Sequence, residues 1–119
     1  MHELAICQSL LREVEVIAAR HGGRKVMQIV VAIGPLAGVE SQLLQRAFTV
    51  ARAGTVADQA VLDVETGPVA VWCETCGAET FVPANALLCG GCGTWQVRLK
   101  SGDEMQLKRV ELAEVAAAI

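Results

Sequence analysis

The chain has 119 residues, 53% of them hydrophobic, which is enough for one domain, or for a small domain beside a second one held by metal. No apolar run approaches the roughly 18 residues of a membrane span, so we expect no membrane protein. Ten basic and thirteen acidic residues give a net charge of −3, and the basic residues are scattered. A nucleic-acid-binding protein would gather them into a basic patch. No secretory signal is recognisable, so we expect a reducing, cytoplasmic compartment.

The N-terminal stretch is predicted to be an amphipathic helix of about five turns, because apolar residues recur in it at three- and four-residue spacing. Gly22 and Gly23 should end this helix, with Arg20 and His21 in its last turn, where positive charge suits the helix dipole. We interpret His21 as a helix-end residue, since no neighbour in the sequence supports it as a metal ligand. Cys7 is expected to be a buried free thiol.

The next segments alternate between strand and helix patterns. Residues 25–33 are rich in β-branched types and predict a strand that is apolar on both faces, as in a central strand. Gly34-Pro35 should end it, and a helix is predicted over residues 40–53. Residues 60–66 predict a further short strand, and Gly67-Pro68 marks a boundary.

Two strands are predicted near the C-terminus, over residues 94–100 and 105–112, whereas the pattern of the tail from residue 113 onward decides nothing. The last strand is expected to return to the sheet formed by the first two. We therefore predict an α+β fold, in which two helices lie on a three-stranded sheet. This domain would comprise residues 1–68 plus 104–119, with an inserted zinc-ribbon domain over residues 69–103.

The most specific motif is the sequence WCETCGAETFVPANALLCGGCGT at residues 72–94. Cys73 and Cys76 form one C-x-x-C pair, and Cys89 and Cys92 form a second pair. Each pair is followed by a glycine, which can adopt the positive φ that such a turn requires. Four thiolates at this spacing predict a closed, tetrahedral, structural zinc site with no open position for a substrate.

Two other interpretations of the cysteines are weaker. A disulfide framework would require an oxidising compartment. A thioredoxin-like redox site would need a single C-x-x-C motif at a strand-to-helix junction, rather than two in a glycine-rich loop.

Several segments together resemble the HypA/HybF hydrogenase maturation family over essentially the whole chain. They are MHEL at 1–4, CQSLL at 7–11, IGPLAGVE at 33–40, WCETC with CGGC, and LKRVEL at 107–112. The initial MHE with the G-x-x-x-G-V-E motif is more specific than the cysteine pairs. The resemblance implies a nickel metallochaperone that delivers Ni(II) for the large subunit of [NiFe]-hydrogenase together with a GTPase of the same pathway. Some members of the family also support urease maturation.

The N-terminal residues have the chemistry that this role requires. The Met1 amine, the backbone nitrogens of His2 and Glu3, and the His2 ring can offer Ni(II) four nitrogens in a plane. Because His2 is too large for the usual aminopeptidase to remove Met1, we expect Met1 to be retained. The sequence leaves open whether Glu40 or His21 also contributes to the nickel site.

Two classes of function follow. The first is a metal-delivery factor that binds proteins and has no catalysis of its own. The second is a zinc-ribbon module that binds nucleic acid or a transcription complex; the scattered basic residues and the N-terminal α/β domain argue against it. An enzyme is not expected, because the sequence shows no nucleophile–base pair, phosphate-binding loop or paired carboxylates.

Overall fold

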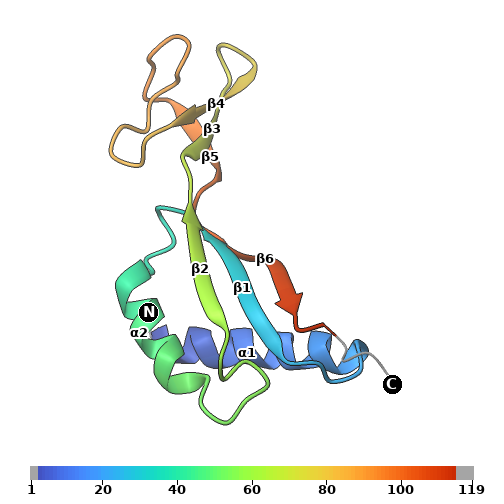
Figure 1. Ribbon diagram of the computed structural model, residues 1–119. Coiled ribbons are helices and arrows are strands. Elements are labelled where there is room, and N and C mark those ends of the chain that lie inside the picture. The colour runs from blue at the N-terminus through green and yellow to red at the C-terminus, as the bar shows by residue number, and fades with distance from the viewer. Residues whose placement is uncertain (1–2, 115–119) are drawn as a thin grey trace. The chain divides into compact units, whose positions relative to one another are not determined.

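The computed structural model describes residues 3–114 and has mixed α and β structure (Figure 1). The helices and strands are α1 (Glu3–Arg20), β1 (Val26–Ile33), α2 (Ser41–Ala51), β2 (Val61–Thr66), β3 (Val69–Cys73), β4 (Ala78–Val82), β5 (Val97–Ser101) and β6 (Met105–Leu112). Neither helix in this part of the chain is long and apolar enough to cross a membrane. The predicted α+β class is confirmed.

Residues 3–31, 39–64 and 107–114 belong to one compact unit, called here the first unit. It contains both helices and the main part of a three-stranded sheet with the order β2-β1-β6. β1 is central, which explains why five of its eight residues are buried. The prediction of two helices and a three-stranded sheet, in which the last strand of the chain pairs with the first strand, is therefore confirmed.

The C-terminal end of α1 has the predicted glycine cap. The Gly23 amide donates to the Ala18 carbonyl at 2.8 Å and the Gly22 amide to the Ala19 carbonyl at 3.3 Å. Gly22 and Gly23 have φ values of 83° and 71°, a conformation that other residues rarely adopt. This is the Schellman pattern, and it satisfies carbonyls that would otherwise lack a partner at the helix end.

α1 and α2 pack together through a contact between Cys7 and Leu44. The Cys7 side chain is fully buried, and its Sγ lies 3.5 Å from the Leu44 carbonyl oxygen. Burial, followed by the charge of Glu3, raises the pKa of the Cys7 thiol to about 11. The thiol therefore stays protonated and acts as a small apolar residue, as predicted.

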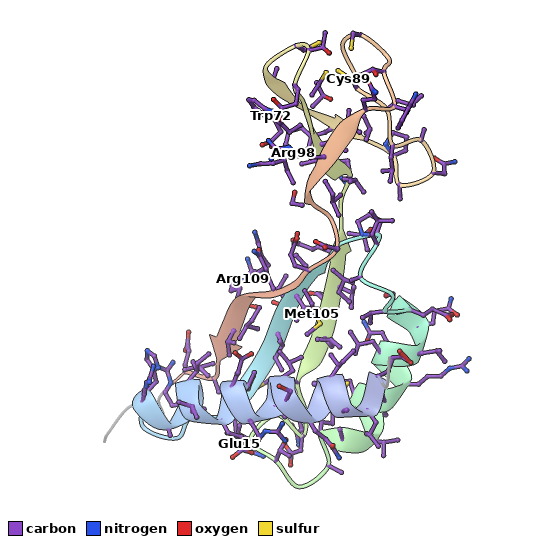
Figure 2. The ribbon with its side chains drawn as sticks, turned by 180° about the vertical axis from the view of Figure 1, so that it is seen from behind. Glu15, Trp72, Cys89, Arg98, Met105 and Arg109 are labelled. Atoms are coloured by element: carbon purple, nitrogen blue, oxygen red, sulfur yellow. The ribbon has the colours of Figure 1, made fainter. Side chains whose placement is uncertain are left out.

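The alternation between half-buried and exposed residues shifts by one position partway along β6. Met105 and Leu107 are half-buried, then Lys108 and Arg109 are both exposed, and burial resumes at Val110 (Figure 2). Strict alternation would have placed Arg109 on the inner face. The shift keeps the guanidinium out of the core and answers the register question that the sequence left open.

Residues 32–38 and 65–106 belong to the second unit. Its sheet has the order β4-β3-β5, and β3 pairs antiparallel with both neighbours. β3 was not predicted as a strand, although its residues VAVWC are β-forming types. The buried core of this sheet is small and consists of Val69, Val71 and Val82.

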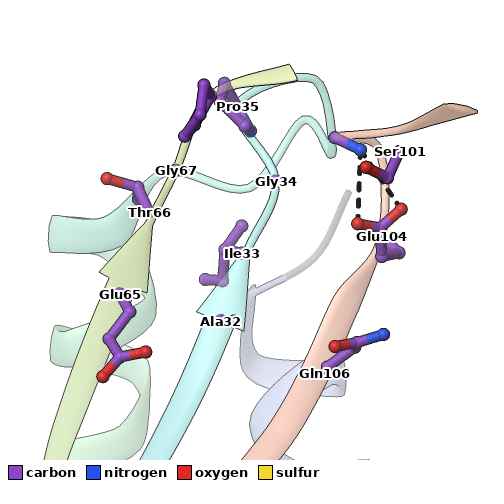
Figure 3. Close-up of a pocket in the computed structure, with 12 residues that line it drawn as sticks. Ala32, Ile33, Gly34, Pro35, Glu65, Thr66, Gly67, Ser101, Glu104 and Gln106 are labelled. Atoms are coloured by element: carbon purple, nitrogen blue, oxygen red, sulfur yellow. Dashed lines mark hydrogen bonds between the residues drawn. The ribbon is translucent and has the colours of Figure 1, made fainter. Parts of the chain in front are cut away.

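Two glycines let chain segments of the second unit meet at van der Waals distance. The Gly34 amide donates to the Glu104 carbonyl at 2.8 Å, and the Leu36 amide donates to the Gly102 carbonyl at 2.7 Å. Figure 3 shows this region, which lines an open pocket of about 220 Å³. A Cβ on Gly34 would overlap the carbonyl of Gly102. Gly102 has a φ of 126° and packs against Val69.

Because of this close approach, we expect Gly34→Ala to lower the free energy of unfolding by roughly 1–3 kcal/mol. The added methyl group would force the backbone at residue 34 away from the backbone at Gly102. Gly67→Ala is the matched control, since nothing lies within 4 Å of a Cβ at Gly67 and its φ is not positive. Denaturant unfolding of both variants measures the difference. Equal denaturation midpoints for the two variants would show that the approach of Gly34 to Gly102 leaves room for a methyl group.

Candidate metal centre

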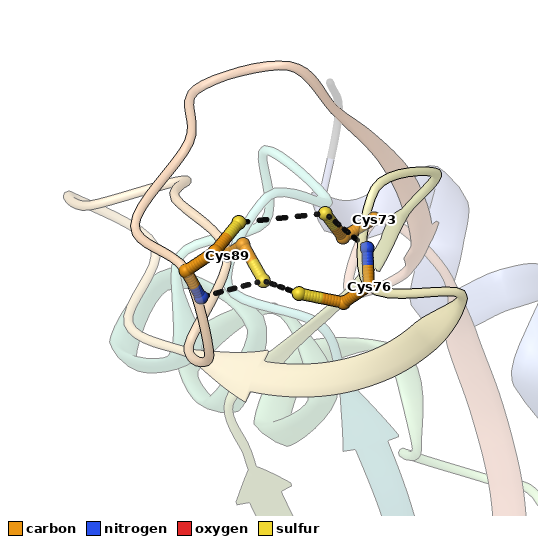
Figure 4. Close-up of side chains that lie close together, drawn as sticks. Cys73, Cys76 and Cys89 are labelled. Atoms are coloured by element: carbon orange, nitrogen blue, oxygen red, sulfur yellow. Dashed lines mark hydrogen bonds between the residues drawn. The ribbon is translucent and has the colours of Figure 1, made fainter.

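Four cysteine side chains converge in the second unit (Figure 4). Cys73 is the last residue of β3, and Cys76 follows in the turn before β4. Cys89 and Cys92 lie in the loop that leads to β5. The Sγ atoms of Cys73 and Cys92 are 3.7 Å apart, as are those of Cys76 and Cys89. All four sulfurs lie within 4.8 Å of one another, so the predicted convergence of both pairs is found.

The sulfur spacing fits tetrahedral zinc. With Zn–S bonds of about 2.3 Å, the edge of an ideal tetrahedron is about 3.8 Å. Two of the sulfur pairs already have this separation. A site of four thiolates has no ligand position left for a substrate, which is the arrangement of a structural zinc site rather than a catalytic one.

The two C-x-x-C turns have the same backbone geometry. The Gly77 amide donates to the Cys73 carbonyl at 2.8 Å, and the Gly93 amide donates to the Cys89 carbonyl at 3.0 Å. Both glycines have positive φ, as predicted. The sequence pattern C-x-x-C-G therefore encodes one local structure twice.

Backbone amides in these turns point at the sulfurs. The Gly91 and Cys92 amides donate to the Cys89 Sγ at 3.3 and 3.4 Å, and the Cys76 amide donates to the Cys73 Sγ at 3.4 Å. The bonds from Cys92 and Gly91 lower the pKa of Cys89 to about 6. Hydrogen bonds with the thiols of Cys92 and Cys89 raise the pKa of Cys76 to about 12. The backbone N–H groups thus favour the thiolate form of Cys89. A divalent cation bound by the four sulfurs would replace the protons that the thiols share in these hydrogen bonds.

The residues predicted for nickel do not all fall within the described part of the chain. Met1 and His2 lie outside it, and Glu3 is the first residue of α1. His21 lies just beyond the other end of α1, where its Nδ1 is 2.9 Å from the Ile17 carbonyl oxygen. Glu40 is the exposed N-cap residue of α2, and its side chain makes no capping hydrogen bond.

Comparison with known proteins identifies the family. A family model described as "Hydrogenase/urease nickel incorporation, metallochaperone, hypA" matches residues 1–112, which include the cysteine motif and the N-terminus. The chain belongs to the HypA family.

Individual HypA proteins resemble this chain over nearly their full length. The hydrogenase maturation factor HypA of Nitrosospira multiformis is 46% identical over 112 residues, which are 94% of this chain and 97% of that protein. The same factor of Aquifex aeolicus is 41% identical with the same coverage. The solution structure of the nickel metallochaperone HypA from Helicobacter pylori aligns with a TM-score of 0.69 at 29% identity, over 94% of this chain and 97% of that one.

The cysteine cluster predicts that the purified protein contains one zinc ion per chain, with four sulfur ligands in X-ray absorption. Cys73→Ala should lose this zinc to a chelator and increase amide exchange in residues 65–106, because the small core there cannot replace the metal. Cys7→Ala is the control for loss of a thiol, and it should keep its zinc. Nitrogen or oxygen ligands alone around zinc would refute the assignment.

Proposed function

We propose that this protein is a nickel metallochaperone. It binds Ni(II) at its N-terminus and delivers the ion for maturation of the large subunit of [NiFe]-hydrogenase, with no catalysis of its own. The observation that supports this proposal best is the match of residues 1–112 to a family described by nickel incorporation. In this proposal residues 1–68 and 104–119 form the nickel domain, and residues 69–103 form the zinc domain.

The nickel ligands in this proposal are the Met1 amine, the backbone nitrogens of His2 and Glu3, and the His2 ring. Four nitrogens in a plane are a set that Ni(II) accepts and that structural zinc does not favour. Glu3 is the first residue that the structure describes, and it belongs to α1. In this proposal its backbone nitrogen binds nickel.

The length of α1 argues against His21 as a further ligand of the nickel bound at His2. The chain has two histidines, His2 and His21. At about 1.5 Å per residue, α1 separates His21 from Glu3 by about 27 Å. The His21 ring also interacts with the Ile17 carbonyl at 2.9 Å. In a single chain, nickel bound at His2 therefore has no imidazole ligand from His21.

The four cysteines hold zinc as a structural ion in this proposal. Their donor set is soft sulfur that is already gathered at the required spacing, whereas the N-terminal set is nitrogen, which suits Ni(II). The two metals are thus separated by ligand chemistry as well as by place in the chain. Zinc maintains the fold of the second unit, and nickel is the cargo.

The partners in this proposal are proteins: the maturation GTPase, the hydrogenase large subunit and, where urease is also served, its maturation proteins. Several basic side chains are engaged within the described chain. Lys25 pairs with Asp58 at 2.7 Å, Arg98 pairs with Glu74 at 3.2 Å, and Arg24 donates to the Ala113 carbonyl. These contacts reduce the cationic surface that a nucleic acid would need.

The N-terminal ligand set predicts that nickel binding requires a chain that starts at Met1. One extra residue in front converts the Met1 amine into an amide, and His2→Ala removes the imidazole. Calorimetric titration of the untagged protein with Ni(II) should show binding that both changes abolish. Neither change touches a buried residue of the described core, so the zinc content and circular dichroism should not change.

Two further variants complete this test. His21→Ala should bind nickel as tightly as the unchanged chain, and Glu40→Gln measures whether the carboxylate at the start of α2 contributes. If the extended chain bound nickel with unchanged affinity, the N-terminal site would be wrong.

A further inference from the structure

A groove lies between α1 and β6 in the first unit. It has a volume of about 260 Å³, and the residues that line it are Glu13, Val16, Ile17, Arg20 and Leu107. Val16 is 51% exposed, whereas Ile17 and Leu107 are half-buried. The described part of the chain therefore leaves the apolar lining of this groove partly open to water.

The described chain ends close to one end of this groove. The Ala113 amide, just after β6, donates to the Lys25 carbonyl at 2.7 Å, and the Arg24 Nε donates to the Ala113 carbonyl at 2.7 Å. Lys25 and Arg24 follow the glycine cap of α1, so these two bonds hold Ala113 beside the C-terminal end of the helix (Figure 1). Arg20, in the last turn of α1, is the groove residue nearest to that end.

The residues after Glu114 have the sequence VAAAI, which contains no polar side chain. We call residues 115–119 the tail. The family model matches residues 1–112, so the tail lies beyond the matched part of the chain. Val115 and Ile119 are its largest side chains. Residues at this spacing lie on the same face of a helix and also of a strand, so in both conformations the two side chains can contact one surface.

We propose that the tail binds in the groove between α1 and β6 of its own chain, with Val115 and Ile119 against the apolar lining. Residues 114–119 span roughly 20 Å when extended and about 9 Å when helical. The groove residues of α1, from Arg20 to Glu13, extend over about 10 Å of helix. The tail is therefore long enough to lie along most or all of the groove.

Covalent attachment favours the tail over a separate protein as the occupant. The groove is a small surface, whereas standard interfaces between proteins bury about 800 Å² on each partner. A tethered segment has an effective concentration of about millimolar, so a few apolar contacts are enough to hold it. The tail also brings no charged side chain to the groove, so neither Glu13 nor Arg20 meets a like charge from it.

Nuclear magnetic resonance of the zinc-loaded, full-length protein tests this contact. We expect nuclear Overhauser effects between the methyl groups of the tail and those of Val16, Ile17 and Leu107. Backbone order parameters in the tail should approach the value of about 0.85 that is typical of a rigid backbone. Ile119→Asp should remove these contacts and lower the order parameters below about 0.6, because a carboxylate is costly to bury against apolar side chains.

Two exposed valines on the helices provide a matched pair of variants. Val16 lines the groove, whereas Val50 on α2 is 69% exposed and does not line it. Val16→Asp should release the tail, and Val50→Asp, which adds the same charge, should leave it bound. Circular dichroism checks that the helices of each variant are intact, and Ile119→Asp tests the same contact from outside the described core.

Mixing isotope-labelled with unlabelled protein distinguishes contacts within one chain from contacts between copies. Contacts between tail and groove within one chain support the proposal. A tail in the unchanged protein with order parameters below about 0.6 and no contact with the groove overturns it. Contacts only between copies, or release of the tail by Val50→Asp as well as by Val16→Asp, also overturn it.

Discussion

The convergence of four cysteine sulfurs within 4.8 Å of one another is the constraint on which the second unit depends. Its sheet has strands of five residues and a buried core of Val69, Val71 and Val82, which is little apolar burial for a segment of this length. Sulfur atoms 3.7 Å apart, with backbone amides donating to Cys73 and Cys89, supply what that core lacks once a metal joins them. A metal bound there would join the local turns and the sheet into one cooperative structure.

The first unit depends on ordinary packing. Both helices contact each other through a buried thiol, and β1 is central in its sheet, so no metal is needed to hold these elements together. In the proposed function nickel binds at Met1, His2 and Glu3 rather than among the packed residues of this unit. A ligand set that uses the chain terminus can gain and release its ion without disturbing a core residue. That property suits a cargo, whereas a site of four thiolates within the fold suits a permanent ion.

Much of this arrangement could be predicted from the sequence, because local signals agreed with the fold. Periodic apolar residues defined α1, paired glycines predicted its end, and C-x-x-C-G spacing predicted both metal-binding turns. β3 was missed because its five residues were interpreted only as the approach to Cys73. The pairing of Trp72 with Glu79 on β4 and with Arg98 on β5 could not be predicted, since no local pattern specifies the register of strands. The overlap of Gly34 with Gly102 is likewise a long-range contact.

In the proposed function the two metals occupy different sites with different donor atoms. X-ray absorption at the nickel edge, on untagged protein loaded with one nickel and one zinc per chain, can distinguish these sites. We expect only nitrogen and oxygen ligands around nickel, a planar geometry and the scattering pattern of an imidazole ring. Sulfur ligands around nickel, with zinc displaced from Cys73 and its three neighbours in the cluster, would contradict it.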